Sequence, residues 1–555
     1  MSDLLALDRL SIGLPRGGDR RHAISDVSLT IDADEIVCLV GESGSGKSMA
    51  AHAILRLLPD GIGITGGAVR FRGRDLAAAS EAEMRGVRGG QIAMIFQEPL
   101  SALNPLKRVG EQIAEVIRIH DPALPREAVA ARIGGLIADV GLPEPATMVR
   151  NFPFQLSGGQ RQRVMIAMAM ANDPALLLAD EPTTALDVTT QGQILALIRR
   201  LQAERRMGVL LITHDFGVVA DMADRVVVMR EGRIVEQGSA DAILTSPQDP
   251  YTRALIAAVP SARPKGTAAA RRRPASPPLL EIEDLGKTFV TRQGWFRPPR
   301  RVVAAEGVSL TVAPGETVAV VGESGSGKST LGQMILRLTE PDSGRIRFEG
   351  TDLLALRGEA LRLARRRLQI VFQDPFSALD PRQRVGAAIA RGPIAYGTPA
   401  ADARSAAAKL LVRVGLQEAA AERFPHEFSG GQRQRICIAR ALALKPRLLV
   451  ADEAVSALDV SVQARILDLL AELRREYDLA MVFITHDLRI AARIADRVVV
   501  MQRGRIVEAG TAEAVFTAPE HPYTRALVAA IPGRRLFGGL GGAADAPAVP
   551  ESVTA

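Results

Sequence analysis

The chain contains 555 residues, which is more than one hydrophobic core usually serves, so we expect at least two domains. Hydrophobic residues make up 47% of it and charged residues 24%, the ordinary composition of a globular protein. The 69 Lys and Arg exceed the 62 Asp and Glu by a net charge of +7, a surplus too small for this length to argue for a nucleic-acid or lipid partner.

The cysteines and the apolar runs exclude further classes of protein. Cys38 and Cys437 are the two cysteines, so neither a disulfide framework nor a cysteine zinc site is expected, and both are interpreted as small buried hydrophobes. The longest apolar run, Val164–Ala171, has eight residues, whereas a membrane-spanning helix needs about 20. Met1–Leu5 lacks the pattern of a secretory signal. We therefore expect a soluble protein that depends on separate subunits for any membrane role.

Internal repeats show that one unit has been duplicated. Four motifs occur twice in the same order, at Gly41–Ser48 and Gly322–Ser329, Ser157–Arg163 and Ser429–Arg435, Ile212–Asp215 and Ile484–Asp487, and Pro250–Leu255 and Pro522–Leu527. Each half should therefore have the same fold. We expect one domain over residues 1–260 and another over 279–537, joined by a Pro/Ala/Arg-rich linker at 261–278 and followed by a disordered tail at 538–555.

The first half begins its core with a buried strand. Glu35–Val40 is a short apolar run that ends at a glycine, and Ser48–Leu58 after it has helical spacing. Between Gln97 and Ser157 the strand signal fades, and Val109–His120 and Arg126–Val140 are predicted as helices. An all-helical insertion is therefore expected there, and the second half offers the same pattern between residues 373 and 429.

Two further buried strands are predicted at Leu176–Leu178 and Val209–Ile212, with helical stretches between them. Such alternation implies an α/β fold, in which a mostly parallel sheet is flanked by helices. We therefore predict two tandem α/β domains, each with an all-helical insertion subdomain.

The repeated motif Gly-x-x-x-x-Gly-Lys-Ser matches the P-loop pattern and lies between a predicted strand and a predicted helix, the context that supports it. Its glycines let backbone N–H groups curl around phosphates, while the lysine adds positive charge and the serine hydroxyl can bind Mg²⁺. A single match can be accidental, but two in this context are not. The residues are Gly41, Glu42, Ser43, Gly44, Ser45, Gly46, Lys47 and Ser48, and Gly322, Glu323, Ser324, Gly325, Ser326, Gly327, Lys328, Ser329 and Thr330.

Paired carboxylates end the next buried strand, at Asp180 and Glu181 and again at Asp452 and Glu453. Ligands bind at this end of the strands in open α/β sheets. After a P-loop, the aspartate suits Mg²⁺ and the glutamate suits proton acceptance from the attacking water.

At this point the chain resembles the ABC ATPase family along nearly its whole length. Leu156–Gln160 and Phe428–Gln432 look like the ABC signature. The Q-loop, D-loop and switch positions are matched by Gln97 and Gln373, by Ala185–Asp187 and Ala457–Asp459, and by His214 and His486. Ser157 and Ser429 each open a helix whose first N–H groups can bind a phosphate.

The resemblance implies two ATP sites formed by intramolecular head-to-tail pairing of the two domains, with Mg²⁺ as cofactor. The first site would combine Lys47, Ser48, Gln97, Asp180, Glu181 and His214 with Ser429, Gly430, Gly431 and Gln432. The second would combine Lys328, Ser329, Gln373, Asp452, Glu453 and His486 with Ser157, Gly158, Gly159 and Gln160. The implied metal ligands are Ser48, Gln97 and Asp180, and Ser329, Gln373 and Asp452, and the implied catalytic residues are Glu181, His214, Glu453 and His486.

Two departures from the family pattern distinguish the halves. The family usually places an aromatic side chain upstream against adenine, where the second half has Phe289 and the first has Leu14. The second half also has Ala454 where the first has Pro182, which loosens the turn after the glutamate. We expect weaker adenine binding in the first site and an altered rate in the second.

Pro250–Pro260 and His521–Pro532 resemble the C-terminal segment of dipeptide, oligopeptide and nickel importer ATPases, as do Gln97–Pro105 and Gln373–Pro381. The resemblance implies a peripheral subunit on the cytoplasmic side of the plasma (inner) membrane, with two transmembrane permease subunits docked on insertions near residues 98–150 and 374–428 and an extracytoplasmic solute-binding protein. Some relatives hold an iron–sulfur cluster on tail cysteines, and none is expected here. Dipeptides, longer or modified peptides, glutathione and nickel complexes all remain open as solutes.

Two alternatives stay open. A soluble ABC ATPase acting on ribosomes or DNA also fuses two domains, but it usually has a long, charged helical linker, and this chain shows no large basic patch or zinc motif. No nucleic-acid partner is therefore expected. An exporter ATPase is disfavoured by the importer-like segments, by analogy alone.

Overall fold

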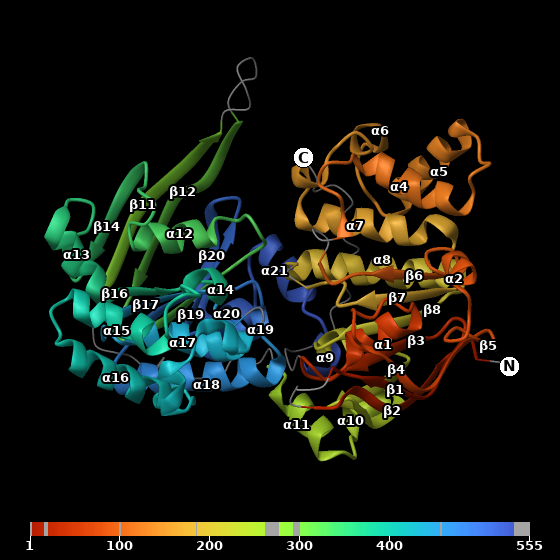
Figure 1. Cartoon of the computed structure of the whole chain (residues 1–555). Helices are drawn as coiled ribbons and strands as arrows, with labels where there is room; N and C mark the ends of the chain where they lie inside the picture. The colour runs from red at the N-terminus through yellow and green to blue at the C-terminus, as the bar shows by residue number, and fades with distance from the viewer. Residues whose placement is uncertain are drawn as a thin grey trace. The chain divides into compact units, whose positions relative to one another are not determined.

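The computed structural model describes residues 3–15, 20–98, 102–184, 186–260, 277–291, 300–455 and 458–537. The chain divides into two compact units that correspond to its two halves, with the division in the sequence between Val259 and Pro260. Each unit has two sheets with helices packed on them, so the predicted fold class of two tandem α/β domains is confirmed (Figure 1). The domain limits 1–260 and 279–537 stay predictions. The predicted tail, and the predicted linker except residues 277 and 278, lie outside the described residues.

The main sheet of the first unit has the strand order β10-β9-β3-β8-β7-β6. All neighbours are parallel except β9 and β10. Its strands are β3 (Ile36–Val40), β6 (Ile92–Ile95), β7 (Leu176–Asp180), β8 (Gly208–Thr213), β9 (Arg225–Arg230) and β10 (Arg233–Ser239). Every residue of β3, β7 and β8 is buried, as expected for strands covered on both faces. Because β7 extends two residues beyond the predicted Leu178, Asp180 is its last residue.

A second sheet in the first unit is antiparallel, with the order β2-β1-β4-β5, and the sequence patterns did not predict it. Its strands are β1 (Leu5–Gly13), β2 (His22–Ile31), β4 (Gly63–Phe71) and β5 (Arg74–Asp75). The register between β1 and β2 shifts three times, and Arg9 and Asp26 adopt left-handed φ angles of 47° and 56°. These irregularities break the alternation of apolar and polar residues by which such strands are recognised.

The helices of the first unit include the predicted insertion. They are α1 (Lys47–Ile54), α2 (Glu81–Val87), α4 (Val109–His120), α5 (Arg126–Asp139), α6 (Pro145–Met148), α7 (Gly158–Ala169), α8 (Val188–Arg205), α9 (Phe216–Met222), α10 (Ala240–Thr245) and α11 (Pro250–Ala258), with 3₁₀ turns at Pro153–Gln155 and Met170–Asn172. Helix α1 ends four residues before the predicted Leu58, because Arg56 turns left-handed with a φ of 51°.

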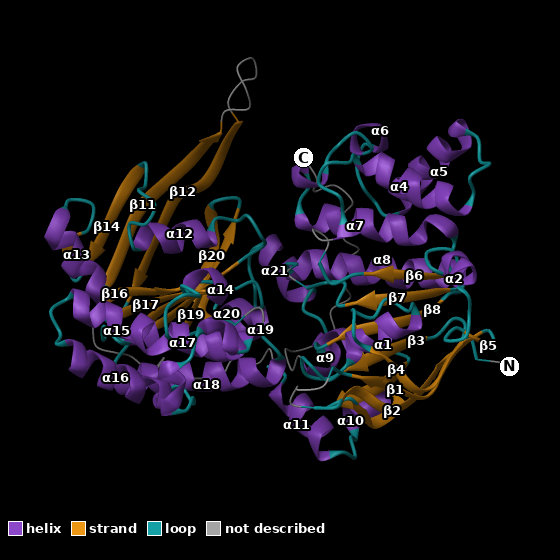
Figure 2. Cartoon of the chain, viewed as in Figure 1, coloured by secondary structure: helices purple, strands orange, loops and turns teal. Residues whose placement is uncertain are grey.

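The second unit repeats this plan, with sheet orders β16-β17-β18-β13-β19-β20 and β12-β11-β14-β15 (Figure 2). Its strands are β11 (Leu280–Thr291), β12 (Arg300–Val312), β13 (Thr317–Val321), β14 (Ser343–Phe348), β15 (Thr351–Asp352), β16 (Leu368–Val371), β17 (Leu448–Asp452), β18 (Ala480–Ile484), β19 (Arg497–Gln502) and β20 (Arg505–Thr511). Its helices are α12 (Lys328–Ile335), α13 (Gly358–Arg367), α14 (Pro375–Ala378), α15 (Val385–Ala395), α16 (Ala400–Arg413), α17 (Gly430–Leu442), α18 (Val460–Tyr477), α19 (Leu488–Ile494), α20 (Ala512–Thr517), α21 (Pro522–Ala529) and α22 (Arg534–Phe537), with 3₁₀ turns at Glu418–Glu422 and Pro425–Glu427.

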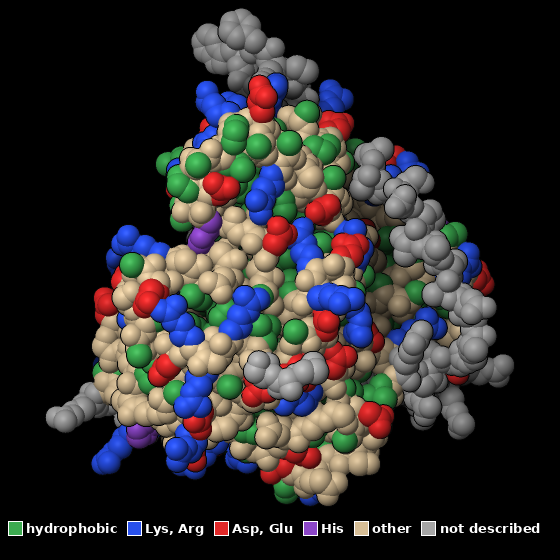
Figure 3. All heavy atoms as spheres, turned by 90° about the vertical axis from the view of Figure 1, so that its right-hand side faces the viewer, with side chains coloured by type: hydrophobic (Ala, Val, Ile, Leu, Met, Phe, Trp, Pro, Cys, Tyr) green, Lys and Arg blue, Asp and Glu red, His purple; other side chains and the backbone are tan. Residues whose placement is uncertain are grey.

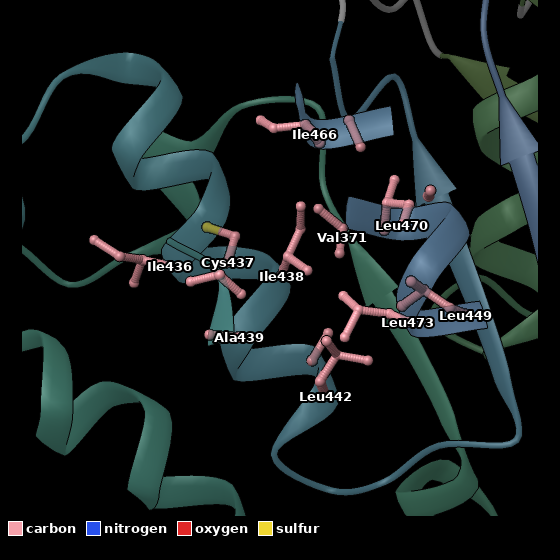
Figure 4. Close-up of a cluster of buried hydrophobic side chains, with 14 of the residues drawn as sticks. Val371, Ile436, Cys437, Ile438, Ala439, Leu442, Leu449, Ile466, Leu470 and Leu473 are labelled. Carbon is pink, nitrogen blue, oxygen red and sulfur yellow. The ribbon is translucent and has the colours of Figure 1, made fainter. Parts of the chain in front are cut away.

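One hydrophobic core of the second unit joins its insertion to its main sheet. Ile438 on α17 and Leu470 on α18 lie in it beside Val371 and Leu449 of the sheet (Figure 4). Cys437 belongs to the same cluster, and burial raises the pKa of its thiol to about 11. Cys38 is fully buried in β3, and burial raises the pKa of its thiol too. Both cysteines are therefore buried hydrophobes, as predicted.

The surface mixes charges of both signs. On the face in Figure 3, the side chains of Lys and Arg are interspersed with those of Asp and Glu. This pattern agrees with the small net charge and the interpretation of a solvated surface. Among the described residues, no helix combines the length and the apolar character that crossing a membrane requires.

Candidate ATP-binding sites

The P-loop of the first unit connects β3 to α1, and that of the second connects β13 to α12. All residues of Gly41–Ser48 and Gly322–Thr330 lie in these loops or in the first turns of the helices. Gly41 has a φ of 152°, and a side chain there would collide with the carbonyl oxygen of Met229. Gly322 has a φ of 148° and faces the carbonyl oxygen of Met501 in the same way. Both loops therefore require glycine at their first position.

The P-loop lysines are buried and bind their own loops. Lys47 Nζ donates to the carbonyl oxygens of Gly41 at 2.8 Å and Glu42 at 2.9 Å. Lys328 Nζ makes the same contacts in the second unit, at 2.8 Å and 2.7 Å. Burial lowers the pKa of both lysines, because the charged ammonium group is withdrawn from water. A phosphate at this loop would meet a positive charge that is already positioned.

The hydroxyl after each lysine contacts the aspartate at the end of the neighbouring strand. Ser48 Oγ donates to Asp180 Oδ1 at 3.1 Å, and Ser329 Oγ donates to Asp452 Oδ1 at 2.9 Å. Burial raises the pKa of both aspartates, and the hydrogen bond from each serine opposes that effect. A hydroxyl and a carboxylate in contact are hard oxygen donors of the kind that Mg²⁺ prefers, so the residues fit this ion.

Glu181 is the residue on which the side chains of the first site converge. Its carboxylate accepts hydrogen bonds from Gln97 Nε2 at 3.0 Å and Thr184 Oγ1 at 2.9 Å, and its Oε1 lies 3.1 Å from His214 Nδ1. Its backbone is left-handed, with a φ of 46°. A strained conformation at a glutamate costs roughly 1–3 kcal/mol and is typical of functional sites.

Glu181 and His214 shift each other's pKa. Burial raises the pKa of the Glu181 carboxyl, but the hydrogen bond and positive charge of His214 prevail and bring it to about 2. Burial lowers the pKa of His214, and the hydrogen bond and negative charge of Glu181 prevail and raise it. Each side chain therefore favours the charged form of the other.

The second unit assembles the same group around Glu453. Gln373 Nε2 donates to Glu453 Oε2 at 2.7 Å, and His486 Nδ1 lies 3.3 Å from Glu453 Oε1. The φ of Glu453 is 47°. Burial lowers the pKa of His486, but the hydrogen bond and charge of Glu453 prevail and raise it. In both units the Q-loop glutamine contacts the glutamate, and its role as a metal ligand stays a prediction.

Each signature serine caps its helix with a reciprocal pair of hydrogen bonds. Ser157 accepts from the N–H of Gln160, and the Gln160 side chain accepts from the N–H of Ser157 at 3.0 Å. Ser429 and Gln432 repeat this capping box on α17. The N–H groups of the two glycines between serine and glutamine take no part in the box, so they remain as donors of the first turn.

The two glycines of each signature differ in their surroundings. A Cβ at Gly159 would lie 2.6 Å from Thr190 Cγ2, and one at Gly431 would lie 2.6 Å from Val462 Cγ1. A Cβ at Gly158 would be 3.7 Å from Leu186 Cδ2, and none of the described atoms lies within 4 Å of one at Gly430. Steric crowding therefore requires glycine at the second position of each pair but not at the first.

The adenine end differs between the units. Leu14 is partly buried against the core of the first unit. Phe289 is 40% exposed, with Lys287 Nζ 5.6 Å from its ring centroid. In the first unit Arg20 also donates to the carbonyl oxygen of Gly44 in the P-loop, at 2.7 Å. An exposed aromatic face suited to stacking on a base is thus present in the second unit.

Four contacts in these sites were not expected from sequence. Two are those of Arg20 and Thr184 described above, and in the other two the hydroxyls of Tyr251 and Tyr523 accept the N–H groups of Glu42 and Glu323 in the P-loops. The tyrosines stand in the repeated Pro-Tyr-Thr-Arg motif, and that repetition was the one signal that marked them. Ala185 and Ala457 of the predicted D-loops, and residues 99–101 after Gln97, lie outside the described residues. The combination of each P-loop with the signature of the other half stays a prediction.

Comparison with known proteins gives matches in both halves. The family model described as ABC transporter matches residues 24–184 and 305–456. The model described as the C-terminal region of oligopeptide/dipeptide transporters matches residues 235–293 and 507–536. Glutathione import ATP-binding protein GsiA from Salmonella paratyphi A is 48% identical over 559 residues, which cover 96% of this chain and 90% of that protein.

The protein of the same name from Escherichia coli (strain K12) is 48% identical over 563 residues, with the same coverage of both chains. Among solved structures, cbiO1 from Clostridium perfringens, part of the cbiONQ transporter complex, is 29% identical. That match covers 43% of this chain and 91% of cbiO1, with a TM-score of 0.38.

Proposed function

The chain belongs to the ABC transporter family, as a fused two-domain ATPase of the dipeptide, oligopeptide and nickel importer group, and we propose that it energises import of a small peptide. Glutathione is the first candidate solute, because the relatives named above are glutathione import proteins that match nearly the whole chain. The observation that supports the proposal most is that both halves combine a converging glutamine, glutamate and histidine with a peptide-transporter C-terminal region.

We propose that ATP binds each P-loop with its phosphates against the loop N–H groups and the lysine ammonium. Ser48 with Asp180, and Ser329 with Asp452, would hold Mg²⁺, which neutralises phosphate charge when bound. Ser48 contacts Asp180 at 3.1 Å and Ser329 contacts Asp452 at 2.9 Å, so each site offers a hydroxyl and a carboxyl oxygen, the hard donors that Mg²⁺ prefers.

Glu181 and Glu453 are the proposed general bases for the attacking water. A carboxylate whose pKa is about 2 is a weak proton acceptor, so Glu181 must lose some of its partners to become basic. His214 and Gln97, which contact it at 3.1 Å and 3.0 Å, are the proposed γ-phosphate contacts. When His214 turns toward ATP, the pKa of Glu181 rises, because the effect of burial is then less opposed. Catalysis is thereby coupled to the presence of the nucleotide.

The two halves are proposed to pair head to tail, so that each signature serine and its glycines complete the site of the other half. The insertions near residues 98–150 and 374–428 are the proposed docking elements for two transmembrane permease subunits. An extracytoplasmic solute-binding protein would deliver the peptide. This arrangement puts the chain on the cytoplasmic side of the plasma (inner) membrane.

A gentle detergent pull-down of the tagged full chain from its own cells tests the importer proposal. We expect two multi-span permeases to be enriched, and uptake of labelled glutathione to be lost when the chain is replaced by a Lys47→Ala, Lys328→Ala variant. Enrichment of ribosomal or DNA-repair proteins without membrane proteins would contradict the importer proposal. Loss of dipeptide uptake with unchanged glutathione uptake would reassign the solute.

A further inference from the structure

The C-terminal segment of each half places a tyrosine hydroxyl on the P-loop of the same half. Tyr251 on α11 accepts a hydrogen bond from the backbone N–H of Glu42 at 3.2 Å. Tyr523 on α21 accepts one from the N–H of Glu323 at 3.0 Å. The chain has four tyrosines, so half of them serve this one contact. The contact crosses about 200 residues of sequence and occurs once in each duplicated unit.

Each tyrosine is held at its backbone as well as at its hydroxyl. In the first unit, Glu236 on β10 accepts the N–H groups of Gln248 at 2.6 Å and Asp249 at 3.2 Å, and Asp249 Oδ1 accepts the N–H of Tyr251 at 2.8 Å. The tyrosine is therefore connected to the edge strand of the main sheet through defined hydrogen bonds.

In the second unit the same path uses different residues. Glu508 on β20 accepts the N–H groups of Glu520 at 2.9 Å and His521 at 3.0 Å, and His521 Nδ1 accepts the N–H of Tyr523 at 3.2 Å. An imidazole thus caps α21 where a carboxylate caps α11, yet the tyrosine hydroxyl reaches the same loop position. The position of the hydroxyl is retained although its support has changed.

The loop residue that each tyrosine holds is also the one that the P-loop lysine holds from the other side. The carbonyl oxygen of Glu42 accepts from Lys47 Nζ at 2.9 Å, and that of Glu323 accepts from Lys328 Nζ at 2.7 Å. When the ammonium group turns toward a phosphate, this carbonyl loses the contact. The tyrosine contact on the N–H does not involve the lysine, so the loss of the lysine contact does not by itself remove it.

The hydroxyls remain neutral under working conditions. Burial raises the pKa of Tyr251 to about 12 and also raises that of Tyr523. Each phenol therefore keeps its proton and its capacity to accept the N–H across the pH range in which proteins work.

We propose that Tyr251 and Tyr523 are positioning residues of the two ATP sites, through which the C-terminal segment of each half sets the ATP affinity of its own P-loop. The inference rests on the proposed binding of ATP at these loops. Without the hydroxyl, the free loop also populates other conformations, and ATP binding must restore the ordered one. One intramolecular hydrogen bond contributes about 0.5–1.5 kcal/mol, so this ordering cost can raise the Kd by up to about 10-fold. We therefore expect a graded loss of affinity rather than loss of the site.

Tyr251→Phe and Tyr523→Phe in the full chain test the proposal, because each removes one oxygen and keeps the ring. To measure ATP binding at one P-loop alone, the lysine of the other P-loop is replaced as well. Tyr251→Phe is therefore combined with Lys328→Ala, and Tyr523→Phe with Lys47→Ala. Tyr396→Phe is the matched control, since Tyr396 OH also bonds a backbone group, the carbonyl oxygen of Arg362 at 2.7 Å, but in the helical insertion. We expect the Kd for MgATP to rise about 2- to 10-fold for Tyr251→Phe and Tyr523→Phe, with a smaller change in kcat, and no change in either for Tyr396→Phe.

Amide hydrogen exchange of the P-loop segments without nucleotide provides a second measurement that does not depend on ATP. Exchange at Glu42 or Glu323 should accelerate in the matching phenylalanine variant alone. A lower melting temperature with unchanged Kd and unchanged loop exchange would overturn the proposal and make the tyrosines merely structural. If the wild-type chain bound no MgATP, the proposed function would fail, while loop exchange would still decide whether the tyrosines hold the loops.

Discussion

The two halves of the chain agree at the phosphate end of their sites and differ at the nucleoside end. Both halves repeat the same hydrogen bonds at closely similar distances. The lysine bonds a carbonyl oxygen of its loop, the serine bonds the aspartate, and the glutamine and histidine bond the glutamate. Beyond these contacts, the first half has Leu14 at the position that corresponds to Phe289 in the second half. Helices α11 and α21 are also capped by different residues. The phosphate chemistry thus tolerates little change in geometry, whereas several side chains can support the base and the C-terminal helix.

The turn after the proposed general base is a subtler difference. Pro182 follows Glu181, while Ala454 follows Glu453, yet the φ angles of the glutamates are 46° and 47°. The loss of proline therefore does not alter the starting conformation of the turn. Its predicted effect on rate must arise from greater backbone freedom, since proline limits the unfolded and alternative states of a chain.

The largest effect that can test this comparison is the loss of a general base. Glu181→Gln and Glu453→Gln, made separately, should each reduce turnover in the altered site by about 100-fold or more. The residual rates of the two variants should differ, because each reports the intact site of the other half. Steady-state ATP turnover at saturating MgATP measures this.

The double variant Glu181→Gln, Glu453→Gln provides the background for that experiment. Equal residual rates in the two single variants would contradict the expected difference between the two sites and show that the departures in sequence have no catalytic consequence. Unequal rates, with the double variant near background, would show that the two sites turn over ATP at different rates.

An intermediate effect is expected at the adenine end. Stacking of a base on an aromatic side chain is worth about 1–3 kcal/mol, so Phe289→Leu should weaken ATP binding in the second half by roughly 5-fold or more. Leu14→Phe should strengthen binding in the first half, because it supplies the aromatic ring that this half lacks. Titration with MgATP and then with a triphosphate that lacks a base separates the two ends, since neither variant should alter binding of the triphosphate.

The smallest expected effect is a shift in the titration of the switch histidines. Burial lowers the pKa of His214 and Glu181 raises it, so Glu181→Gln should lower this pKa while that of His486 remains unchanged. In the wild-type chain the raised pKa of His214 contributes stability that is fully present below about pH 6.5 and is lost as the pH rises through the raised value. The lowered pKa of Glu181 contributes stability that is present above about pH 4.5 and is lost as the pH falls toward about 2. NMR of chains with ¹³C-labelled histidine measures both residues. A shift of His486 in the Glu181→Gln variant would contradict independent titration of the halves.

The main sheets were predictable from sequence because their strands are fully buried apolar runs next to recognisable motifs. Ile36–Val40 ends at Gly41, and Leu176–Asp180 ends in its carboxylate pair. The antiparallel sheet was not, because Arg9 and Asp26 interrupt its pattern with left-handed turns and register shifts. Pairing between distant strands is set by tertiary packing, which local periodicity does not record.

The ATP sites could likewise be predicted from sequence only in part, because motifs do not report contacts between distant residues. Motifs named the residues, but not that Gln97 and His214 both bond Glu181 or that the glutamate is strained. Tyr251 was visible only as part of a repeated segment, since nothing in a sequence reports a hydroxyl that reaches a backbone N–H about 200 residues away. Side-chain identity is local, whereas hydrogen-bond partners follow from the fold.

The paired glycines of each signature have a consequence for how tolerant these positions are to change. A side chain at Gly159 or Gly431 would press on Thr190 or Val462, so a library randomised at either codon should yield chains of lowered stability. Gly158 and Gly430 have room for a methyl group, so variants there should accumulate normally and fail only where growth depends on transport. Adjacent, chemically identical residues are thus under selection for different reasons, one for the integrity of its own half and the other for the task that the halves perform.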